Sequence, residues 1–354
     1  MPNRIYLDHA STTLVLPEAI AAVAEGLARW ANPSSAHADG RAARAALEDA
    51  RARVAAALGW NGRVIFTSGA TEAISLGISQ AAHGDLFVSA VEHPAVLRCA
   101  ADKRRLRVDR QGRVDLADLE DALAGSDRPL VAVQQVNNEI GVVQPLEAVA
   151  ERVRAAGGLL LVDCAQAAGK LPLPDADLLM LAAHKLGGPP GIGALLVRND
   201  APLQAVGGQE GGYRPGTTPV PLVLGFAAAL AAGKAWLENA ALLRTRLEEG
   251  VLAAGGEVIG AGAPRVATIG AYRLPGTPAA AQLMHLDLAG ISVSAGSACT
   301  SGSVKPSHVL AAVGLEDGAT REVIRVSFGR STTASDVDAF LAQYRVLAER
   351  RRAA

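Results

Sequence analysis

Residues 176–193 read Ala-Asp-Leu-Leu-Met-Leu-Ala-Ala-His-Lys-Leu-Gly-Gly-Pro-Pro-Gly-Ile-Gly. The apolar run at 178–183 predicts a buried strand that ends at His184 and Lys185, and a second apolar run at 192–197 follows the glycine-rich turn. A lysine at the dry end of a strand costs free energy unless it is paired or neutral. Lys185 therefore either reaches water on a buried stem or is a Schiff-base lysine whose amine burial makes nucleophilic.

Short apolar runs alternate with helical patterns before this stretch. After two helical patterns at 17–30 and 41–58, strands are expected at 64–67, 85–89, 130–136 and 159–162. This alternation predicts an α/β fold with a mainly parallel sheet and helices on both faces. Polar residues follow the strand ends, which is where open α/β sheets bind ligands.

The C-terminal third has a different pattern. One long helix is expected at 220–254, followed by strands at 266–273, 291–294 and 323–328 and by helices at 279–288 and 335–350. We therefore expect a large domain at 15–250 and a smaller α+β domain made of 1–14 and 251–354.

Composition excludes several classes of protein. Of 354 residues, 50% are apolar and 19% charged, which is typical of a folded globular chain. The net charge of −1 provides no basic field for nucleic acid, and no apolar run approaches the roughly 20 residues of a membrane span. The N-terminus lacks the pattern of a signal peptide. Three cysteines are an odd number without metal-ligand spacing, so we expect reduced thiols in the cytoplasm and no metal site.

Three further features suit the binding of a flat, charged ligand. Ser68-Gly-Ala-Thr-Glu72 joins a strand to a helix, so it is either a phosphate-binding turn or an ordinary helix start capped by Thr71. Asp163 follows a buried strand and either needs a cationic partner, such as a protonated pyridine nitrogen, or caps a helix. His93, before Pro94, either stacks on a flat ring or is a surface residue at a helix start.

Two residues in the C-terminal third suit a reactive or binding role. Cys299 lies in the small-residue loop Ala295-Gly-Ser-Ala-Cys-Thr-Ser-Gly-Ser, where nothing bulky shields it. Arg325 lies inside the apolar run 323–328, where it either captures a substrate carboxylate or forms a salt bridge with an acidic residue.

These residues together resemble the cysteine desulfurase family, NifS-like proteins of the class V aminotransferase-like group with pyridoxal-phosphate fold type I. The resemblance covers nearly the whole chain. It rests on Leu7-Asp8, Asn32-Pro-Ser-Ser-Ala-His37, Thr67-Ser-Gly-Ala-Thr-Glu72, Glu92-His93, Val136-Asn-Asn-Glu-Ile-Gly-Val-Val-Gln144, Val162-Asp163 with Gln166, His184-Lys185, Arg214-Pro-Gly-Thr217, Gly296-Ser-Ala-Cys-Thr300 and Arg325.

The resemblance implies that pyridoxal 5′-phosphate is the cofactor and that Lys185 binds it covalently. Asp163 would pair with its ring nitrogen, Gln166 with its phenolic oxygen, and His93 would stack on its ring. The other cofactor contacts that it implies are Ala70, Thr71, Asn137, His184 and, from a partner subunit, Thr217.

The resemblance also implies the reaction. Arg325 would take the carboxylate of L-cysteine, with Asn32 and Asn137 nearby. Cys299 would attack the substrate sulfur and become a persulfide, leaving L-alanine, and His93 could take part in proton transfer. The sulfur would pass to an acceptor protein that serves iron–sulfur cluster assembly or tRNA thiolation. The family forms homodimers with active sites at the interface, and neither membrane nor direct nucleic-acid binding is expected.

The chain departs from the family pattern at several positions. Ala182 replaces a serine two residues before His184, which removes a hydroxyl that could bond the phosphate, and Gly211 replaces an arginine. The rival functions are a selenocysteine lyase, a pyridoxal-phosphate aminotransferase and a degenerate sulfur carrier. Transamination needs no thiol, and an intact set of Lys185, Asp163, His93 and Cys299 argues against a carrier.

Overall fold

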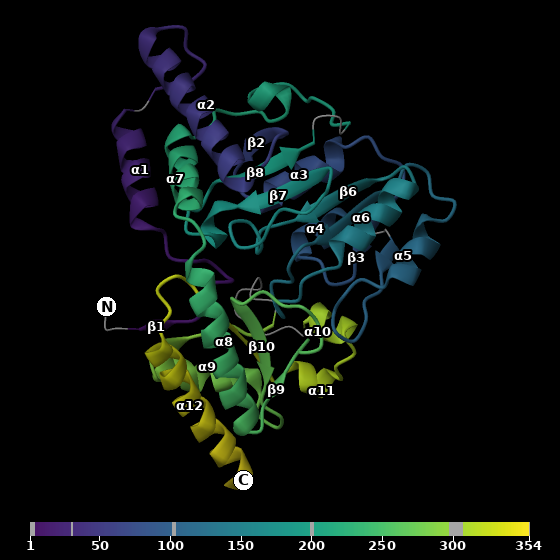
Figure 1. Ribbon diagram of the computed structural model, residues 1–354, viewed down its shortest axis with the longest axis vertical. Helices are drawn as coiled ribbons and strands as arrows, with labels where there is room; N and C mark the ends of the chain where they lie inside the picture. Colours follow the sequence, from purple (N-terminus) through teal and green to yellow (C-terminus); the bar gives the residue numbers. More distant parts are fainter. Residues whose placement is uncertain (1–3, 30, 101–103, 199–201, 297–306, 354) are drawn as a thin grey trace.

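The computed structural model describes residues 4–29, 31–100, 104–198, 202–296 and 307–353. Figure 1 shows two lobes, an upper one built on a large sheet and a lower one that contains the C-terminus. The strands are β1 (Ile5–Tyr6), β2 (Arg63–Thr67), β3 (Leu86–Ser89), β4 (Arg104–Leu106), β5 (Leu130–Gln134), β6 (Leu159–Asp163), β7 (Leu178–Ala182), β8 (Gly193–Val197), β9 (Glu257–Val258), β10 (Ile269–Arg273), β11 (Ile291–Ser292) and β12 (Val323–Ser327).

Helices alternate with most of these strands along the chain. They are α1 (Pro17–Ala28), α2 (Ala38–Leu58), α3 (Ala70–Gln80), α4 (Pro94–Cys99), α5 (Leu116–Leu123), α6 (Leu146–Ala155), α7 (Val220–Ala231), α8 (Trp236–Ala253), α9 (Ala279–Leu288), α10 (His308–Ala312), α11 (Asp317–Thr320) and α12 (Ala334–Ala353), with single 3-10 turns η1 (Ala183–Lys185) and η2 (Glu210–Gly212).

The large sheet has seven strands in the order β2-β8-β7-β6-β5-β3-β4. Neighbouring pairs from β7 to β4 are parallel, whereas β8 runs antiparallel to both β7 and β2. The α/β class with a mainly parallel sheet is confirmed.

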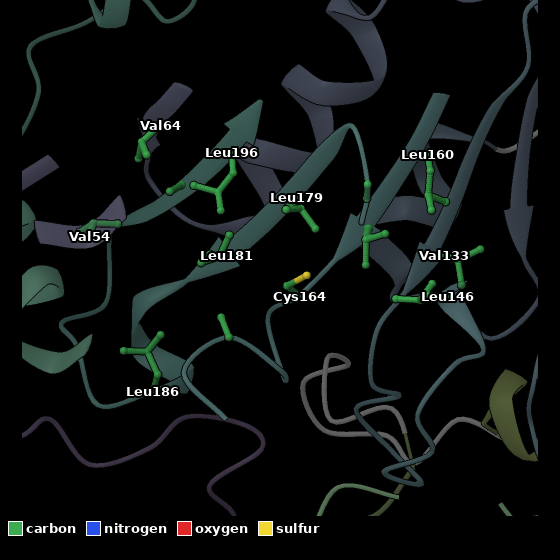
Figure 2. Packing of buried hydrophobic residues seen from close by; sticks show 14 of the residues in the cluster. Val54, Val64, Val133, Leu146, Leu160, Cys164, Leu179, Leu181, Leu186 and Leu196 are labelled. Carbon is green, nitrogen blue, oxygen red and sulfur yellow. The ribbon is translucent and has the colours of Figure 1, made fainter. Parts of the chain in front are cut away.

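Both faces of this sheet are buried. Successive residues of β7 point to opposite faces, so that Leu179 and Leu181 enter one hydrophobic cluster and Leu178 and Met180 enter another. Figure 2 shows the first cluster, in which the Cys164 side chain lies among buried aliphatic residues. Strands covered on both faces read as unbroken apolar runs, which is the pattern that the sequence shows.

The lower lobe contains a three-stranded antiparallel sheet, β12-β10-β9, and the short pair β1-β11. The N-terminal strand lies here, because Ile5 pairs with Ile291 and Asp8 bridges to Ser327. The domain boundaries 15–250 and 1–14 with 251–354 stay a prediction.

The expectation of one helix at 220–254 is wrong. The helix breaks between α7 and α8, whose axes bend by 71°. Gly233 follows α7 with a φ of +72°, a left-handed conformation that ends helices and that glycine adopts without steric cost. In the described part of the chain, no single helix is both long and apolar enough to cross a membrane.

Candidate active site

A cavity of about 450 Å³ lies at the carboxyl edge of the parallel strands. Segments far apart in the sequence form its wall. They are the turn 68–72 after β2, His93 after β3, Asp163 at the end of β6, Lys185 after β7, and Arg325 from β12 of the other lobe. The sheet therefore brings together polar residues that the sequence distributes over more than 250 positions.

The N-terminal segment positions Lys185. The ammonium group of Lys185 donates to the backbone oxygens of Ala10 at 2.5 Å and of Ser11 at 2.6 Å. These residues come from the N-terminal segment before α1, to which the sequence analysis assigned no role in the site. The quoted motif Leu7-Asp8 was the one signal that could have drawn attention to this segment.

The turn before α3 offers free hydrogen-bond donors. The N-cap residue is Gly69, which provides no side-chain cap, so the alternative in which Thr71 caps the helix is wrong. Gly193 lets β8 approach this turn, because a Cβ there would lie 2.7 Å from the Cα of Gly69. Ala70 and Thr71 line the cavity at the positive end of the helix dipole, which suits a phosphate.

His184 lines the same cavity as this turn. Burial and the neighbouring Lys185 lower its pKa to about 4, so the imidazole is neutral at pH 7. One ring nitrogen, Nδ1, lies 3.2 Å from the Thr12 hydroxyl. His184 thus faces the cavity as a neutral hydrogen-bonding group rather than as a cation.

Asp163 and Gln166 are two buried polar residues that line the cavity. One carboxylate oxygen of Asp163 accepts from the backbone N–H of Ala165 at 2.8 Å, and burial raises the pKa of this carboxyl. Gln166 donates to the Ala10 carbonyl at 2.9 Å, while its own Oε1 is buried with no hydrogen-bond partner among the described residues. A buried carboxylate and a buried amide oxygen both require a donor.

His93 lies at a helix start, as one alternative predicted, and its stacking on a flat ring stays a prediction. It is the N-cap of α4, where its Nδ1 accepts from the backbone N–H of Ala95 at 3.1 Å, and it also lines the cavity. Burial, with a contribution from Lys185, lowers its pKa to about 4. Because Nδ1 is an acceptor, the neutral ring carries its proton on Nε2.

Arg325 forms an ion pair and also lines the cavity. Its guanidinium donates to Asp8 at 2.8 Å, to the Ser11 hydroxyl at 2.6 Å and to the Asn138 carbonyl at 2.9 Å. Its Nε has no hydrogen-bond partner in the described part of the chain. The salt-bridge alternative is therefore confirmed, and the capture of a substrate carboxylate stays a prediction. The sequence interpretation assigned no role to Asp8, Ser11 or Asn138.

Three expected site residues lie elsewhere in this chain. Asn137 is fully buried with its amide bonded to backbone groups of Val91, Glu139 and Ile140, and it does not line the cavity, so its contact with cofactor or substrate stays a prediction. Asn32 accepts from the Ser34 backbone in the loop before α2. Thr217 lines a separate hollow among α1, α2 and α7. Cys299 lies outside the described residues.

The donors and acceptors around the cavity fit pyridoxal 5′-phosphate. The N-terminus of α3 suits the phosphate of the cofactor, and Asp163 suits its protonated ring nitrogen. Gln166 lies in the region that suits the ring oxygen, and Lys185 suits the aldehyde. The fold and this site define a pyridoxal-phosphate-dependent enzyme of fold type I.

Comparison with known proteins shows to which family of pyridoxal-phosphate-dependent enzymes the chain belongs. The family model "Aminotransferase class-V" matches residues 5–340. A cysteine desulfurase of Cereibacter sphaeroides is 38% identical over 96% of this chain and 94% of its own length. An IscS-like cysteine desulfurase of Mycobacterium tuberculosis is 39% identical over 95% of this chain and 94% of its own. The chain belongs to the cysteine desulfurase family.

Solved structures agree with this assignment. The X-ray structure of a NifS-like protein from Rickettsia africae superposes with a TM-score of 0.89 at 29% identity, covering 98% of this chain and all of that one. The structure titled "SspA in complex with cysteine" superposes with a TM-score of 0.81 at 28% identity, covering 94% of this chain and all of that one.

Proposed function

We propose that this protein is a cysteine desulfurase that converts L-cysteine into L-alanine and transfers the sulfur to Cys299 and then to an acceptor protein. The observation that carries the proposal is the cavity that gathers Lys185, Asp163, His93 and Arg325 in a member of the cysteine desulfurase family. A structural neighbour at 28% identity was solved with cysteine bound, which supports the substrate.

Bound pyridoxal phosphate would supply the electron sink that weakens bonds at the substrate Cα. The chain supplies the rest. Lys185 anchors the cofactor, and Asp163 keeps its ring nitrogen protonated. Arg325 orients the substrate carboxylate through the N–H donor that Asp8, Ser11 and Asn138 leave available on its Nη1. His93 is neutral, with its proton on Nε2 and its Nδ1 occupied by the Ala95 N–H, so its proposed part in proton transfer requires Nδ1 to release that N–H and take up a proton.

Cys299 is the proposed sulfur acceptor within the chain. Cys164 is fully buried beneath the sheet, where burial raises the pKa of its thiol well above the usual range. A buried, protonated thiol is a poor nucleophile. Cys99 is exposed at the end of α4 and is the natural control for a thiol that plays no part in the reaction.

The test combines product analysis with mass spectrometry. Wild-type protein given L-cysteine and a reductant should release alanine and sulfide in equal amounts. After a pulse of L-cysteine without reductant, the added sulfur should lie on Cys299. The Cys299→Ser variant should keep the cofactor and make almost no sulfide, whereas Cys99→Ser should match wild type. Sulfur on Cys99 or Cys164 with Cys299 unmodified would refute the proposal.

Other products would identify the rivals. Glutamate-dependent transamination would indicate an aminotransferase, and turnover of L-selenocysteine with no turnover of L-cysteine would indicate a selenocysteine lyase. The acceptor, in iron–sulfur cluster assembly or tRNA thiolation, can be identified by which purified scaffold or thiolation protein receives labelled sulfur from the Cys299 persulfide.

We also propose a homodimer. Asn32 and Thr217 do not line the cavity of their own chain, and α1 exposes Ile20 and Leu27, at 57% and 61% exposure. In a dimer, Thr217 of one chain could reach the cavity of its partner, and the exposed apolar side chains of α1 could be covered at the interface. Light scattering should give twice the chain mass. Mixed dimers of Lys185→Ala and Thr217→Glu should recover activity that each variant lacks, and no recovery would contradict a shared site.

A cytoplasmic location is proposed because Cys99 and Cys164 are free thiols.

A further inference from the structure

A second cavity lies on the other side of the segment that holds Lys185. It has a volume of about 300 Å³, at the lower end of the range usual for small-molecule sites. It lies where the segment before α1, the first residue of α8 and the ends of β10 and β12 meet. Ala10 and Lys185 line both cavities, so they form part of the wall between them.

Two buried polar groups in this second cavity have no partner. Lys170 is 9% exposed, and no hydrogen bond or ion pair to its ammonium exists among the described residues. Burial, with a contribution from Lys185, lowers its pKa to about 7. Thr268 is 1% exposed, and its hydroxyl has no hydrogen-bond partner in the described part of the chain. A buried polar group without a hydrogen-bond partner destabilises the folded protein. A ligand that accepts hydrogen bonds from both groups would remove this destabilisation.

The charges around the cavity select the class of ligand. Among the described residues, its wall contains the basic side chains Lys170 and Arg330, besides the cofactor lysine Lys185, and no Asp or Glu. Arg330 stacks on Trp236 at 5.5 Å and donates to backbone carbonyls of the turn between α7 and α8. Most of the remaining wall is apolar, formed by residues that include Leu14, Leu16, Leu186 and Phe328. A positive, largely apolar cavity suits an anion with a hydrocarbon body, whereas a wholly polar anion would lose its hydration without compensation.

We propose that this cavity binds a small aliphatic carboxylate, whose carboxylate group accepts hydrogen bonds from Lys170 and Thr268 and whose hydrocarbon chain packs on Leu16, Leu186 and Phe328. The ligand would lie against Ala10, whose carbonyl accepts from the Lys185 ammonium. The proposed site is thus adjacent to the residue that anchors the cofactor. The proposal stands independently of the desulfurase reaction, since it concerns a different cavity.

Titration calorimetry of the cofactor-loaded protein tests the proposal with three probes. Sodium hexanoate should bind saturably at one site, 1-hexanol at least about tenfold more weakly because it lacks the charge, and sodium phosphate not measurably. The Lys170→Met variant should weaken hexanoate binding by about tenfold or more while leaving hexanol binding unchanged. The Thr268→Val variant should weaken it by a few fold, in line with the loss of a neutral hydrogen bond. The matched control is Lys234→Met, an exposed lysine in the turn before α8, which should bind hexanoate as wild type does.

Several results would overturn the proposal. These are the absence of saturable hexanoate binding, equal binding of hexanoate and hexanol, preferential binding of phosphate, or unchanged hexanoate binding in Lys170→Met. Hydrogen exchange of wild-type protein covers the case in which Lys170→Met fails to fold. Hexanoate should slow exchange at 8–16 and 328–331, and protection confined to other segments would place the ligand elsewhere.

Discussion

The carboxyl group of Glu92 offers a quantitative test of burial beside the cofactor cavity. Glu92 is 1% exposed and precedes His93. Its Oε1 accepts from the backbone N–H of Gln134 at 2.8 Å, and its Oε2 has no hydrogen-bond partner among the described residues. Burial, with a contribution from the Asp163 charge, raises its pKa from 4.5 to about 8. Glu92→Gln keeps the shape and the accepting oxygen but removes the titration.

The magnitude follows from proton linkage. The folded protein retains the Glu92 proton at pH values where the unfolded chain has lost it, so stability falls as pH rises from 4.5 to 8. Each pH unit in this window costs about 1.4 kcal/mol, which gives roughly 3 kcal/mol at pH 7 and roughly 5 kcal/mol above pH 8. Below pH 4.5 this cost is absent. Glu92→Gln should therefore be more stable than wild type, by an amount that grows with pH.

Urea unfolding followed by circular dichroism measures this difference. The free energies of unfolding of Glu92→Gln and wild type should nearly coincide at pH 5 and differ by about 3 kcal/mol at pH 7. Glu147→Gln, which changes an exposed residue in the first turn of α6, is the control and should show no such divergence. A difference that does not vary with pH, or a variant less stable throughout, would refute the reasoning and show that Glu92 is ionised and paired.

Three further variants test the proposed site. Lys185→Ala should lose borohydride-fixed cofactor, as judged by mass spectrometry, while Lys170→Ala should retain it; cofactor fixed to another lysine in Lys185→Ala would contradict the assignment. Arg325→Lys keeps the charge but loses the planar fork, so the KM for L-cysteine should rise about 10- to 100-fold with the visible spectrum of the resting enzyme unchanged. Loss of cofactor from Arg325→Lys would instead assign this arginine to structure alone. Ala182→Ser adds a hydroxyl at a residue lining the cavity and should slow the loss of cofactor on dialysis, since a hydrogen bond to a charged group contributes about 1.5–3 kcal/mol. Unchanged retention would show that the phosphate is already satisfied.

Some features of the site follow from local patterns in the chain. Asp163, Lys185 and His93 each follow an apolar run, and ends of parallel strands meet at one edge of a sheet, so their convergence could be expected. Arg325 stood out because a charge inside an apolar strand requires a partner or a ligand. Its partner, Asp8, could not be identified, since the two residues are 317 positions apart and no local pattern links them.

The sequence by itself determined the class of fold, because strand and helix periodicities and buried apolar runs are local properties of the chain. It also determined the family, through motifs spread along nearly the full length. Only the tertiary structure decided that β8 runs antiparallel, that the helical pattern at 220–254 divides at Gly233, and that Asn138 rather than Asn137 lines the cavity. Strand direction, helix breaks and side-chain orientation depend on what each segment packs against. The wall formed by Ala10 and Ser11 behind Lys185 depends on the same packing, since it joins the first residues of the chain to the middle of the sheet.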